Sequence, residues 1–198
     1  MLHIGLIRRF SSNIRPRQIW LAGGCFWGLQ AYLDRLRGVL ATTVGNANGK
    51  KVNPSYEEVC HHNTGHAETA FVQYDADKIS LTTLLTYFFK VIDPTSLNRQ
   101  GNDRGVQYRS GIYYRDSDDL PVIDDIISLE QRKYPTPLVV EVQPLENFYP
   151  AEEYHQNYLA KNPNGYCHID ISALDFDPGA KQNNYSNSNR GERVRVEI

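Results

Sequence analysis

The chain has 198 residues, of which 40% are hydrophobic and 22% charged, an ordinary composition for a globular protein with one sizeable core. Its formal net charge of −2 gives no electrostatic reason to expect a nucleic acid or an anionic membrane as a partner. No apolar run approaches the roughly 18 residues that a membrane-spanning helix needs. We therefore expect one domain that works without a membrane or a nucleic acid.

Residues 1–17 differ from the rest of the chain because they contain several arginines and no acid. Arg8-Arg9-Phe10 followed by two serines is typical of a mitochondrial presequence, and a short bacterial leader has the same composition. Residues 177–198 are polar and mostly rich in Asn and Ser. We expect a leader or disordered extension at 1–17, a folded domain at 18–176 and a poorly ordered tail at 177–198.

The first predicted strand, residues 18–22, leads directly into Gly23-Gly24-Cys25-Phe26-Trp27-Gly28. An apolar stripe with helical spacing follows, at Leu29, Tyr32, Leu33 and Leu36. Cys25 should therefore lie in or just before the first turn of a helix, where unpaired N–H groups and the macrodipole stabilise an anion. This placement predicts a thiolate, and a buried, inert cysteine in a tight turn is the alternative.

Further along the chain, β-branched and aromatic runs predict strands at 39–44, 68–74, 108–114 and 138–142. Helices are predicted from Ser80 to Asp93-Pro94, over 118–133, and as a short element within 148–159. The stretch 45–66 reads as a turn-rich loop. The stretch 95–105 is polar and contains glycine, and it predicts a functional loop.

The first six predicted elements run strand, helix, strand, strand, helix, strand. This order is typical of the split βαβ arrangement of ferredoxin-like folds. It predicts a two-layer α+β core with a mostly antiparallel sheet and both helices on one face, extended by additional helices and long loops. An open doubly wound sheet is the alternative that periodicity leaves open.

Several polar residues of types that catalysis uses fall in predicted loops or at strand ends. They are Tyr56, His66, Glu68, Asp103, Tyr108 and His155. Glu68 opens a strand that we expect to be buried, and desolvation raises the pKa of a carboxyl group there, so that it can act as a general acid near neutral pH. An ordinary strand-end glutamate that faces water is the alternative.

The cysteines and histidines suggest two other kinds of site. Cys60-His61-His62 with His66 is one compact group, whereas zinc sites usually combine two spaced ligand pairs, and we expect no metal. Cys25 with His66 or His155 would make a Cys-His thiol hydrolase, because separation in sequence does not prevent contact in space. A peptide-binding module that uses the aromatic residues beside Cys25 is a non-catalytic alternative.

Five blocks in chain order resemble the A-type methionine sulfoxide reductases. The blocks are Gly24-Cys25-Phe26-Trp27-Gly28, 53–60 (NPSYEEVC), 64–68 (TGHAE), three parts of 93–111 (DPTS, NRQGND, QYRSG) and three parts of 148–167 (FYPAEEYHQ, NP, GYC). The resemblance covers residues 19 to about 168. It implies an enzyme, a peptide-methionine (S)-S-oxide reductase that repairs oxidative damage to free or protein-bound methionine.

In this resemblance Cys25 is the nucleophile that attacks the sulfur of methionine sulfoxide, and Glu68 protonates the sulfoxide oxygen. Phe26 and Trp27 match the residues that line the pocket for the substrate methyl group, and aromatic faces suit a methyl group and sulfur.

Three further residues match the family's substrate site. Tyr56 and Tyr108 correspond to tyrosines that bind the sulfoxide oxygen. Asp103 corresponds to a carboxylate that holds the substrate through ordered water.

The resemblance also implies how the enzyme is regenerated. Reaction leaves a sulfenic acid on Cys25, and Cys167 takes the place of the resolving cysteine that forms a disulfide with it. Thioredoxin would then reduce the 25–167 disulfide by thiol exchange. Cys60 lies in a matching block without an inferred role, and no bound cofactor is expected.

Three scattered cysteines are too few for a secreted disulfide scaffold, which favours a reducing compartment. We expect the cytoplasm, with the mitochondrial matrix as the alternative. No heptad or apolar patch in the sequence calls for an oligomer, so we expect a monomer.

Overall fold

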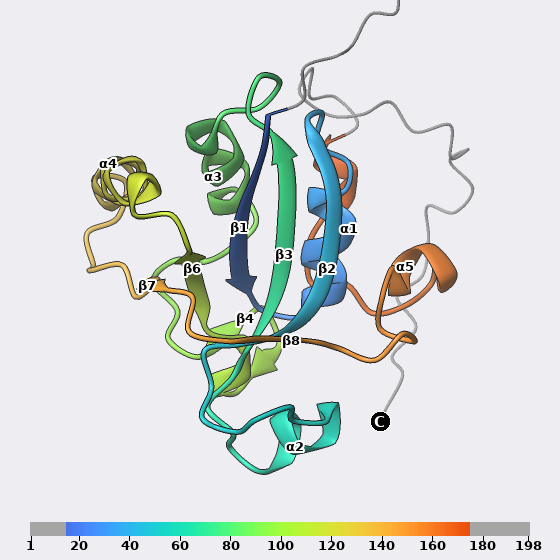
Figure 1. Ribbon diagram of the computed structural model, residues 1–198. Coiled ribbons are helices and arrows are strands. Elements are labelled where there is room, and N and C mark those ends of the chain that lie inside the picture. Colours follow the sequence, from blue (N-terminus) through green and yellow to red (C-terminus); the bar gives the residue numbers. More distant parts are fainter. Residues whose placement is uncertain (1–14, 175–198) are drawn as a thin grey trace, which may run out of the picture.

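The computed structural model describes residues 15–174, which form a mixed α+β fold around a six-stranded sheet with the order β7-β6-β1-β3-β2-β8 (Figure 1). The sheet strands are β1 (Pro16–Gly23), β2 (Val39–Ala47), β3 (Ala67–Asp75), β6 (Ser110–Tyr114), β7 (Glu141–Pro144) and β8 (Phe148–Pro150). The helices are α1 (Phe26–Leu33), α2 (Tyr56–His61), α3 (Leu81–Phe89), α4 (Leu120–Gln131) and α5 (Tyr158–Lys161). Shorter elements are the hairpin β4 (Arg99–Gln100) and β5 (Asp103–Arg104) and the 3₁₀ turns Val106–Tyr108, Ser117–Asp119 and Ile171–Leu174.

The expectation of an α+β fold with a mostly antiparallel sheet is confirmed. Within the six-stranded sheet, β6 and β7 run parallel, and the other neighbouring strands pair antiparallel. The pairing of β2 with β3 shifts register between Val39 and Ala41, an irregularity of the kind that bends and twists a strand.

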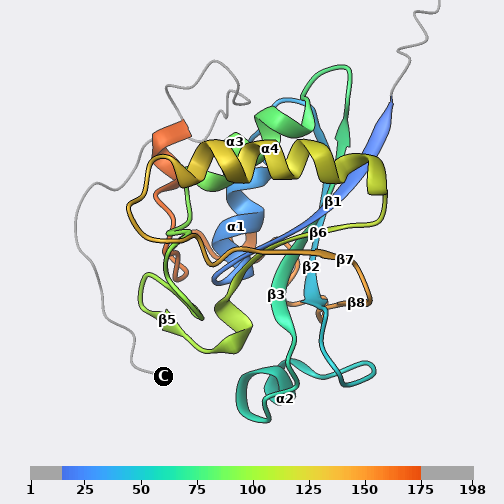
Figure 2. The same ribbon diagram turned by 90° about the vertical axis from the view of Figure 1, so that its left-hand side faces the viewer.

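The two faces of the sheet bury different groups because successive side chains of a strand point to opposite sides. On one face, Ile19 and Leu21 of β1 share a core with apolar side chains of α1, α3 and α4, and these helices lie together on that side of the sheet (Figures 1 and 2). On the other face, Trp20 and Tyr113 pack with Phe148, the first residue of β8.

Local signals explain where the main helices begin. Ser80 caps α3 as predicted, since its hydroxyl accepts a hydrogen bond from the backbone N–H of Thr83. Pro121 lies in the first turn of α4, where its missing N–H has no intrahelical partner to lose.

Four sequence predictions about individual elements need correction. The expected loop 45–66 contains helix α2, which Ser55 and Glu58 start with a reciprocal capping box. The strand predicted at 108–114 begins only at Ser110, because the preceding residues form a 3₁₀ turn. The strand predicted at 138–142 is shifted to β7, and the stretch 148–159 opens with strand β8 before its short helix begins at Tyr158.

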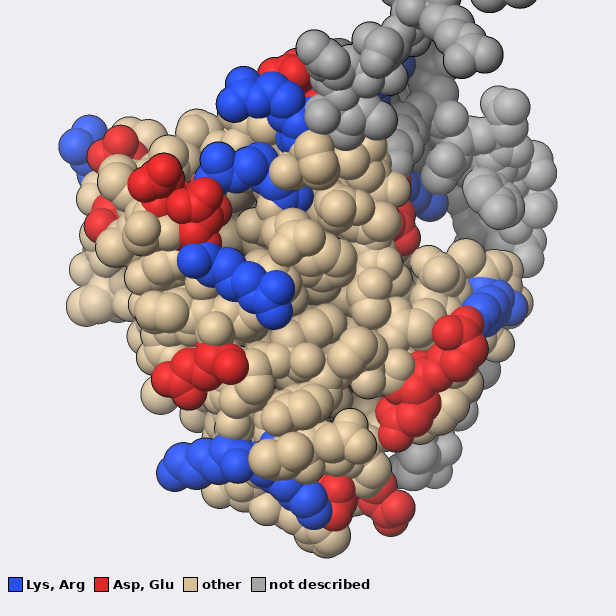
Figure 3. Space-filling view, viewed as in Figure 1, with Lys and Arg blue, Asp and Glu red and all other residues tan. Residues whose placement is uncertain are grey.

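The described part of the chain has no helix that is long and apolar enough to cross a membrane. On the face shown in Figure 3, acidic and basic side chains are interspersed among uncharged ones. Almost all of the expected leader and the whole expected tail lie outside the described residues.

Candidate active site

Cys25 lies between the end of β1 and the first residue of α1, at the N-cap position. The preceding Gly24 has a φ of +82°, a backbone conformation that glycine adopts without strain. A Cβ added at Gly24 would lie only 2.6 Å from Cβ of Gln100, so the turn also requires a residue without a side chain. This turn leaves Cys25 only 7% exposed.

The prediction of a resting thiolate at Cys25 is wrong. The backbone N–H groups of Trp27 and Gly28 lower the pKa of the thiol, as a helix N-terminus should. Burial outweighs them, and the Glu68 carboxyl group adds to the effect when it is ionised, so the pKa of Cys25 is raised above its ordinary value. At neutral pH the group is therefore a thiol until the substrate or a proton acceptor changes its surroundings.

Glu68 is the second residue of β3 and is 1% exposed. Its Oε2 accepts a hydrogen bond from the backbone N–H of Phe26 at 3.1 Å, and its Oε1 has no hydrogen-bond partner among the described residues. Burial raises the pKa of Glu68 from 4.5 to about 8, with a smaller contribution from Asp103. The alternative of a water-facing glutamate is excluded, and the carboxyl group holds a proton at neutral pH.

Two tyrosine hydroxyls come close to this carboxyl group from other elements. Tyr56 is the first residue of α2, and Tyr108 ends the 3₁₀ turn before β6. Burial raises the pKa of both phenols, and the charge of Glu68 is the second cause in each case. Both hydroxyls therefore keep their protons and can donate hydrogen bonds to an oxygen placed near Glu68.

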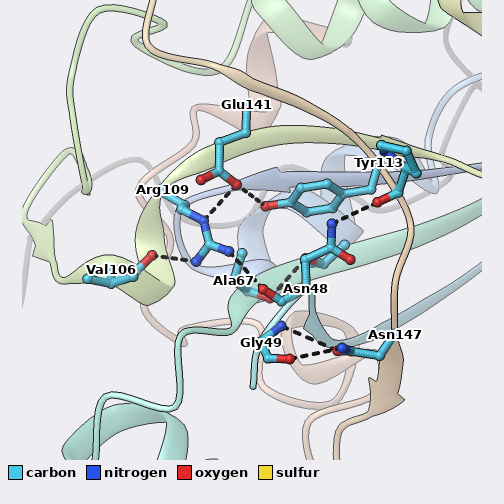
Figure 4. Close-up of polar contacts among 10 residues, drawn as sticks. Asn48, Gly49, Ala67, Val106, Arg109, Tyr113, Glu141 and Asn147 are labelled. Atoms are coloured by element: carbon cyan, nitrogen blue, oxygen red, sulfur yellow. Dashed lines mark hydrogen bonds and ion pairs between the residues drawn. The ribbon is translucent and has the colours of Figure 1, made fainter. Parts of the chain in front are cut away.

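A polar network holds the turn that carries Tyr108 (Figure 4). The buried Arg109 guanidinium donates to the carbonyl oxygen of Val106 at 3.1 Å and to Oε2 of Glu141 at 2.8 Å. The Tyr113 hydroxyl donates to the same Glu141 oxygen at 2.9 Å. Arg109 thereby fixes the position of its neighbour Tyr108 relative to β6 and β7.

Aromatic rings pack against one another beside Cys25. Trp27 stacks on Tyr158 with ring centroids 3.8 Å apart and donates from Nε1 to Nδ1 of His155 at 3.1 Å. The His155 ring also contacts the rings of Phe26 and Tyr56. His155 and Tyr158 thus support the aromatic residues beside Cys25, and periodicity carried no signal for this role because the partners are remote in sequence.

Asp103 contacts the segment that carries Cys167 rather than the Cys25–Glu68 pair directly. Its Oδ2 accepts a hydrogen bond from the Tyr166 hydroxyl at 3.0 Å and lies 3.7 Å from Nδ1 of His168. The sequence interpretation did not assign Tyr166 or His168. Cys167 itself is half-buried, and burial raises the pKa of its thiol.

A family model described as "Peptide methionine sulfoxide reductase" matches residues 17–187. The chain belongs to the A-type peptide methionine sulfoxide reductases. The peptide methionine sulfoxide reductase MsrA of Clostridium botulinum strain Okra is 59% identical over 155 residues, which cover 78% of this chain and 99% of that protein.

Solved structures of relatives agree with this reductase assignment. Mxr1 from Saccharomyces cerevisiae in its reduced form is 39% identical, covers 81% of this chain and 95% of its own, and has a TM-score of 0.73. Mxr1 in complex with Trx2 is 30% identical, covers 73% of this chain and 85% of its own, and has a TM-score of 0.51.

The histidines that would make this reductase a Cys-His hydrolase instead have other partners. His66 Nδ1 lies 2.9 Å from Oγ1 of Thr64, and His155 accepts from Trp27. Over residues 15–174, no hydrogen bond joins either ring to Cys25, and no cluster of three His, Cys, Asp or Glu residues suited to a metal is found. The family membership and these contacts together favour redox chemistry of sulfur over acyl transfer.

Cys60 of the reductase lies on α2, near the Tyr56 hydroxyl and the Glu68 carboxyl group. Its thiol interacts with the Tyr56 hydroxyl, and burial, followed by the charge of Glu68, raises its pKa. A protonated thiol there can orient the Tyr56 hydroxyl.

Proposed function

We propose that this reductase converts methionine S-sulfoxide to methionine at Cys25, with Glu68 as the acid. The observation that carries the proposal is that Oε1 of Glu68 has no hydrogen-bond partner within residues 15–174, in a carboxyl group whose pKa is raised to about 8 by burial. A buried, protonated carboxyl group with one free oxygen can donate a hydrogen bond, and later a proton, to an acceptor placed beside it. A sulfoxide oxygen supplies that acceptor.

The proposed first step balances within the site. The Cys25 sulfur attacks the substrate sulfur while Glu68 gives its proton to the sulfoxide oxygen, and Glu68 regains a proton when the Cys25 thiol loses its own. The protonated oxygen then moves to the Cys25 sulfur as the S–S bond and the S–O bond of the substrate break. The substrate leaves as methionine, reduced by two electrons, and Cys25 is left as a sulfenic acid. Protonated Glu68 no longer repels a developing thiolate on Cys25, which removes one of the causes that raise its pKa.

The proposed substrate contacts divide between polar and aromatic groups. Tyr56 and Tyr108 donate hydrogen bonds to the sulfoxide oxygen, supported by the shared influence of Glu68 on their pKa values. Phe26 and Trp27 hold the methyl group against their rings. Asp103 holds the substrate through water, while its Oδ2 accepts a hydrogen bond from the Tyr166 hydroxyl.

Regeneration is proposed to use Cys167 and a thioredoxin. Cys167 forms a disulfide with the oxidised Cys25, and thioredoxin reduces that disulfide by exchange. The solved complex of the relative Mxr1 with Trx2 supports this choice of reductant. No bound cofactor takes part in the proposed cycle.

Two finer descriptions are also proposals. We infer that β6-β1-β3-β2 with α1 and α3 is a ferredoxin-like split βαβ core, to which β7 and β8 are added at the edges; the strand order supports it.

We propose a monomer in the cytoplasm or, if residues 1–17 direct import, in the mitochondrial matrix; the three free cysteines suit a reducing compartment.

The test is mass spectrometry of the reduced protein after one equivalent of methionine sulfoxide, without a reductant. The proposal predicts one free methionine per chain and a Cys25–Cys167 disulfide. An unchanged protein that hydrolyses a thioester or an activated ester would support the thiol hydrolase instead. An unchanged protein that only binds the oxidised peptide would support the non-catalytic binding module.

A further inference from the structure

The residue after Cys167 anchors its segment to the turn that presents Cys25. Nε2 of His168 lies 3.2 Å from the carbonyl oxygen of Gly23, and Nδ1 lies 3.7 Å from Oδ2 of Asp103. The side chain of His168 is only 5% exposed. One buried ring therefore bonds the C-terminal segment to the end of β1 and lies beside the hairpin that carries Asp103.

The ring of His168 fits into space left by two glycines. A Cβ added at Gly24 would lie 2.9 Å from Nε2 of His168, and one added at Gly101 would lie 3.3 Å from its Cβ. Both glycines also have positive φ values, +82° and +57°. The turn before Cys25 and the tip of the β4–β5 hairpin therefore leave the space that this imidazole ring occupies.

The segment that carries His168 also holds Cys167 against the first turn of α1. The Cys167 thiol donates to the carbonyl oxygen of Ile169 at 3.1 Å, and a Cβ added at Gly28 would lie 2.9 Å from Sγ of Cys167. Residues three apart on a helix surface are neighbours, with Cβ atoms about 5–6 Å apart. Cys167 therefore lies against the first turn of α1, beside a residue three positions after Cys25, in a gap that exists because residue 28 has no side chain.

We propose that His168 is the positioning residue of the resolving step, and that Gly28 is the gap into which it places the Cys167 sulfur. This inference rests on the proposed reductase cycle. In that step the Cys167 sulfur, as its thiolate, attacks the sulfur of the Cys25 sulfenic acid. The new S–S bond forms, the S–O bond breaks, and the departing hydroxide takes up the proton that Cys167 lost, giving water.

The first experiment compares His168→Ala, His168→Gln and the control His62→Gln, which changes an exposed histidine of the α2 region. Reduced protein is mixed with one equivalent of methionine sulfoxide. Released methionine, the Cys25–Cys167 disulfide, and sulfenic acid trapped by a 1,3-dicarbonyl reagent are followed in time. For His168→Ala we expect methionine release at the normal rate, disulfide formation slowed at least ~10-fold, and trapped sulfenic acid on Cys25.

The conservative variant separates positioning from general damage. Glutamine can donate to the Gly23 carbonyl oxygen in place of Nε2, so His168→Gln should recover much of the disulfide rate. His62→Gln should match the unchanged protein in both steps. Equal slowing of both steps in His168→Ala would point to a structural role and overturn the proposal.

A second variant tests the same step from the opposite side. Gly28→Ala keeps the helix, because alanine has the higher helix propensity, but its methyl group fills the place of the Cys167 sulfur. It should also release methionine normally and close the disulfide slowly. If the disulfide forms at the normal rate in both His168→Ala and Gly28→Ala, the inference is refuted. If the protein without any substitution releases no methionine, the proposed function itself is refuted.

Discussion

The backbone N–H of Phe26 donates a hydrogen bond to Oε2 of Glu68 at 3.1 Å, across 42 residues of sequence. This bond joins the first helical residue after Cys25 to the start of β3. It leaves Oε1 as the free oxygen of the carboxyl group. The pair thus sets both the direction of α1 and the oxygen that is available to a substrate.

Glu68→Gln is expected to slow methionine release in a single turnover by ~10²–10⁴-fold, the usual contribution of a general acid. The amide oxygen can still accept from Phe26, so thermal unfolding should show that the fold is kept. The matched control is Glu57→Gln, at an exposed position of α2. Near-normal turnover by the Glu68 variant would end its assignment as the acid.

The pH dependence should report Glu68 directly. Its pKa is about 8, so the single-turnover rate should fall as the pH rises through that value. Because the folded pKa is above the unfolded value of 4.5, its contribution to stability is fully present below pH 4.5 and is lost as the pH rises to about 8. Both effects should be absent from Glu68→Gln. Stopped-flow kinetics measures the pH dependence of the rate, and denaturant unfolding at several pH values measures that of the stability.

Tyr56→Phe and Tyr108→Phe each remove one hydroxyl that we propose binds the sulfoxide oxygen. Each should lower the rate of methionine release by ~10–100-fold. This loss does not exceed the usual effect of removing one oxyanion-hole donor, because the second tyrosine still binds the oxygen. The double variant should lose more than either single one. Tyr134→Phe, beyond the end of α4, serves as the control, and wild-type rates in the double variant would contradict the assignment.

Cys167→Ser should release one methionine per chain and then stop when thioredoxin is the sole reductant. The sulfenic acid on Cys25 then has no partner thiol within the proposed cycle. Cys60→Ser should continue to turn over, since no disulfide of Cys60 is proposed. Many turnovers by Cys167→Ser with thioredoxin would show that another group resolves the sulfenic acid.

Arg109→Met is expected to lower the free energy of unfolding by about 2–3 kcal/mol, because it leaves the Val106 carbonyl and the Glu141 carboxylate without their charged donor. The loss should also raise the KM for methionine sulfoxide, since Arg109 holds the turn that carries Tyr108. Denaturant titration gives the first value and steady-state kinetics the second. Unchanged KM with lowered stability would confine Arg109 to the fold.

Local patterns were sufficient for the main elements because capping and periodicity act over a few residues. Ser80 starts α3 and Asp93-Pro94 follows its end, as the sequence indicates. The same kind of signal, the capping box of Ser55 and Glu58, was present for α2 but was read as part of a loop. Predicted strand limits failed at 108–114 and 138–142, since strand ends depend on pairing with other strands.

The burial of Glu68 could be predicted, because it opens an apolar strand, and burial is the largest cause of its raised pKa. The protonation of Cys25 could not. A helix N-terminus predicts an anion, but the desolvation of the thiol and the proximity of Glu68 reverse the direction of the shift. His155, Tyr166 and His168 were likewise missed as supports, because their contacts cross more than sixty residues.

The sequence by itself determined the family and the order of the first strands and the main helices, because motifs and periodicities are properties of neighbouring residues. Only the tertiary structure decided that Cys25 rests as a thiol, that Glu68 keeps one oxygen free, and that Cys167 lies against Gly28. These features depend on desolvation and on hydrogen bonds between remote segments. They come into existence only when β1, β3 and the segment around Cys167 are packed together.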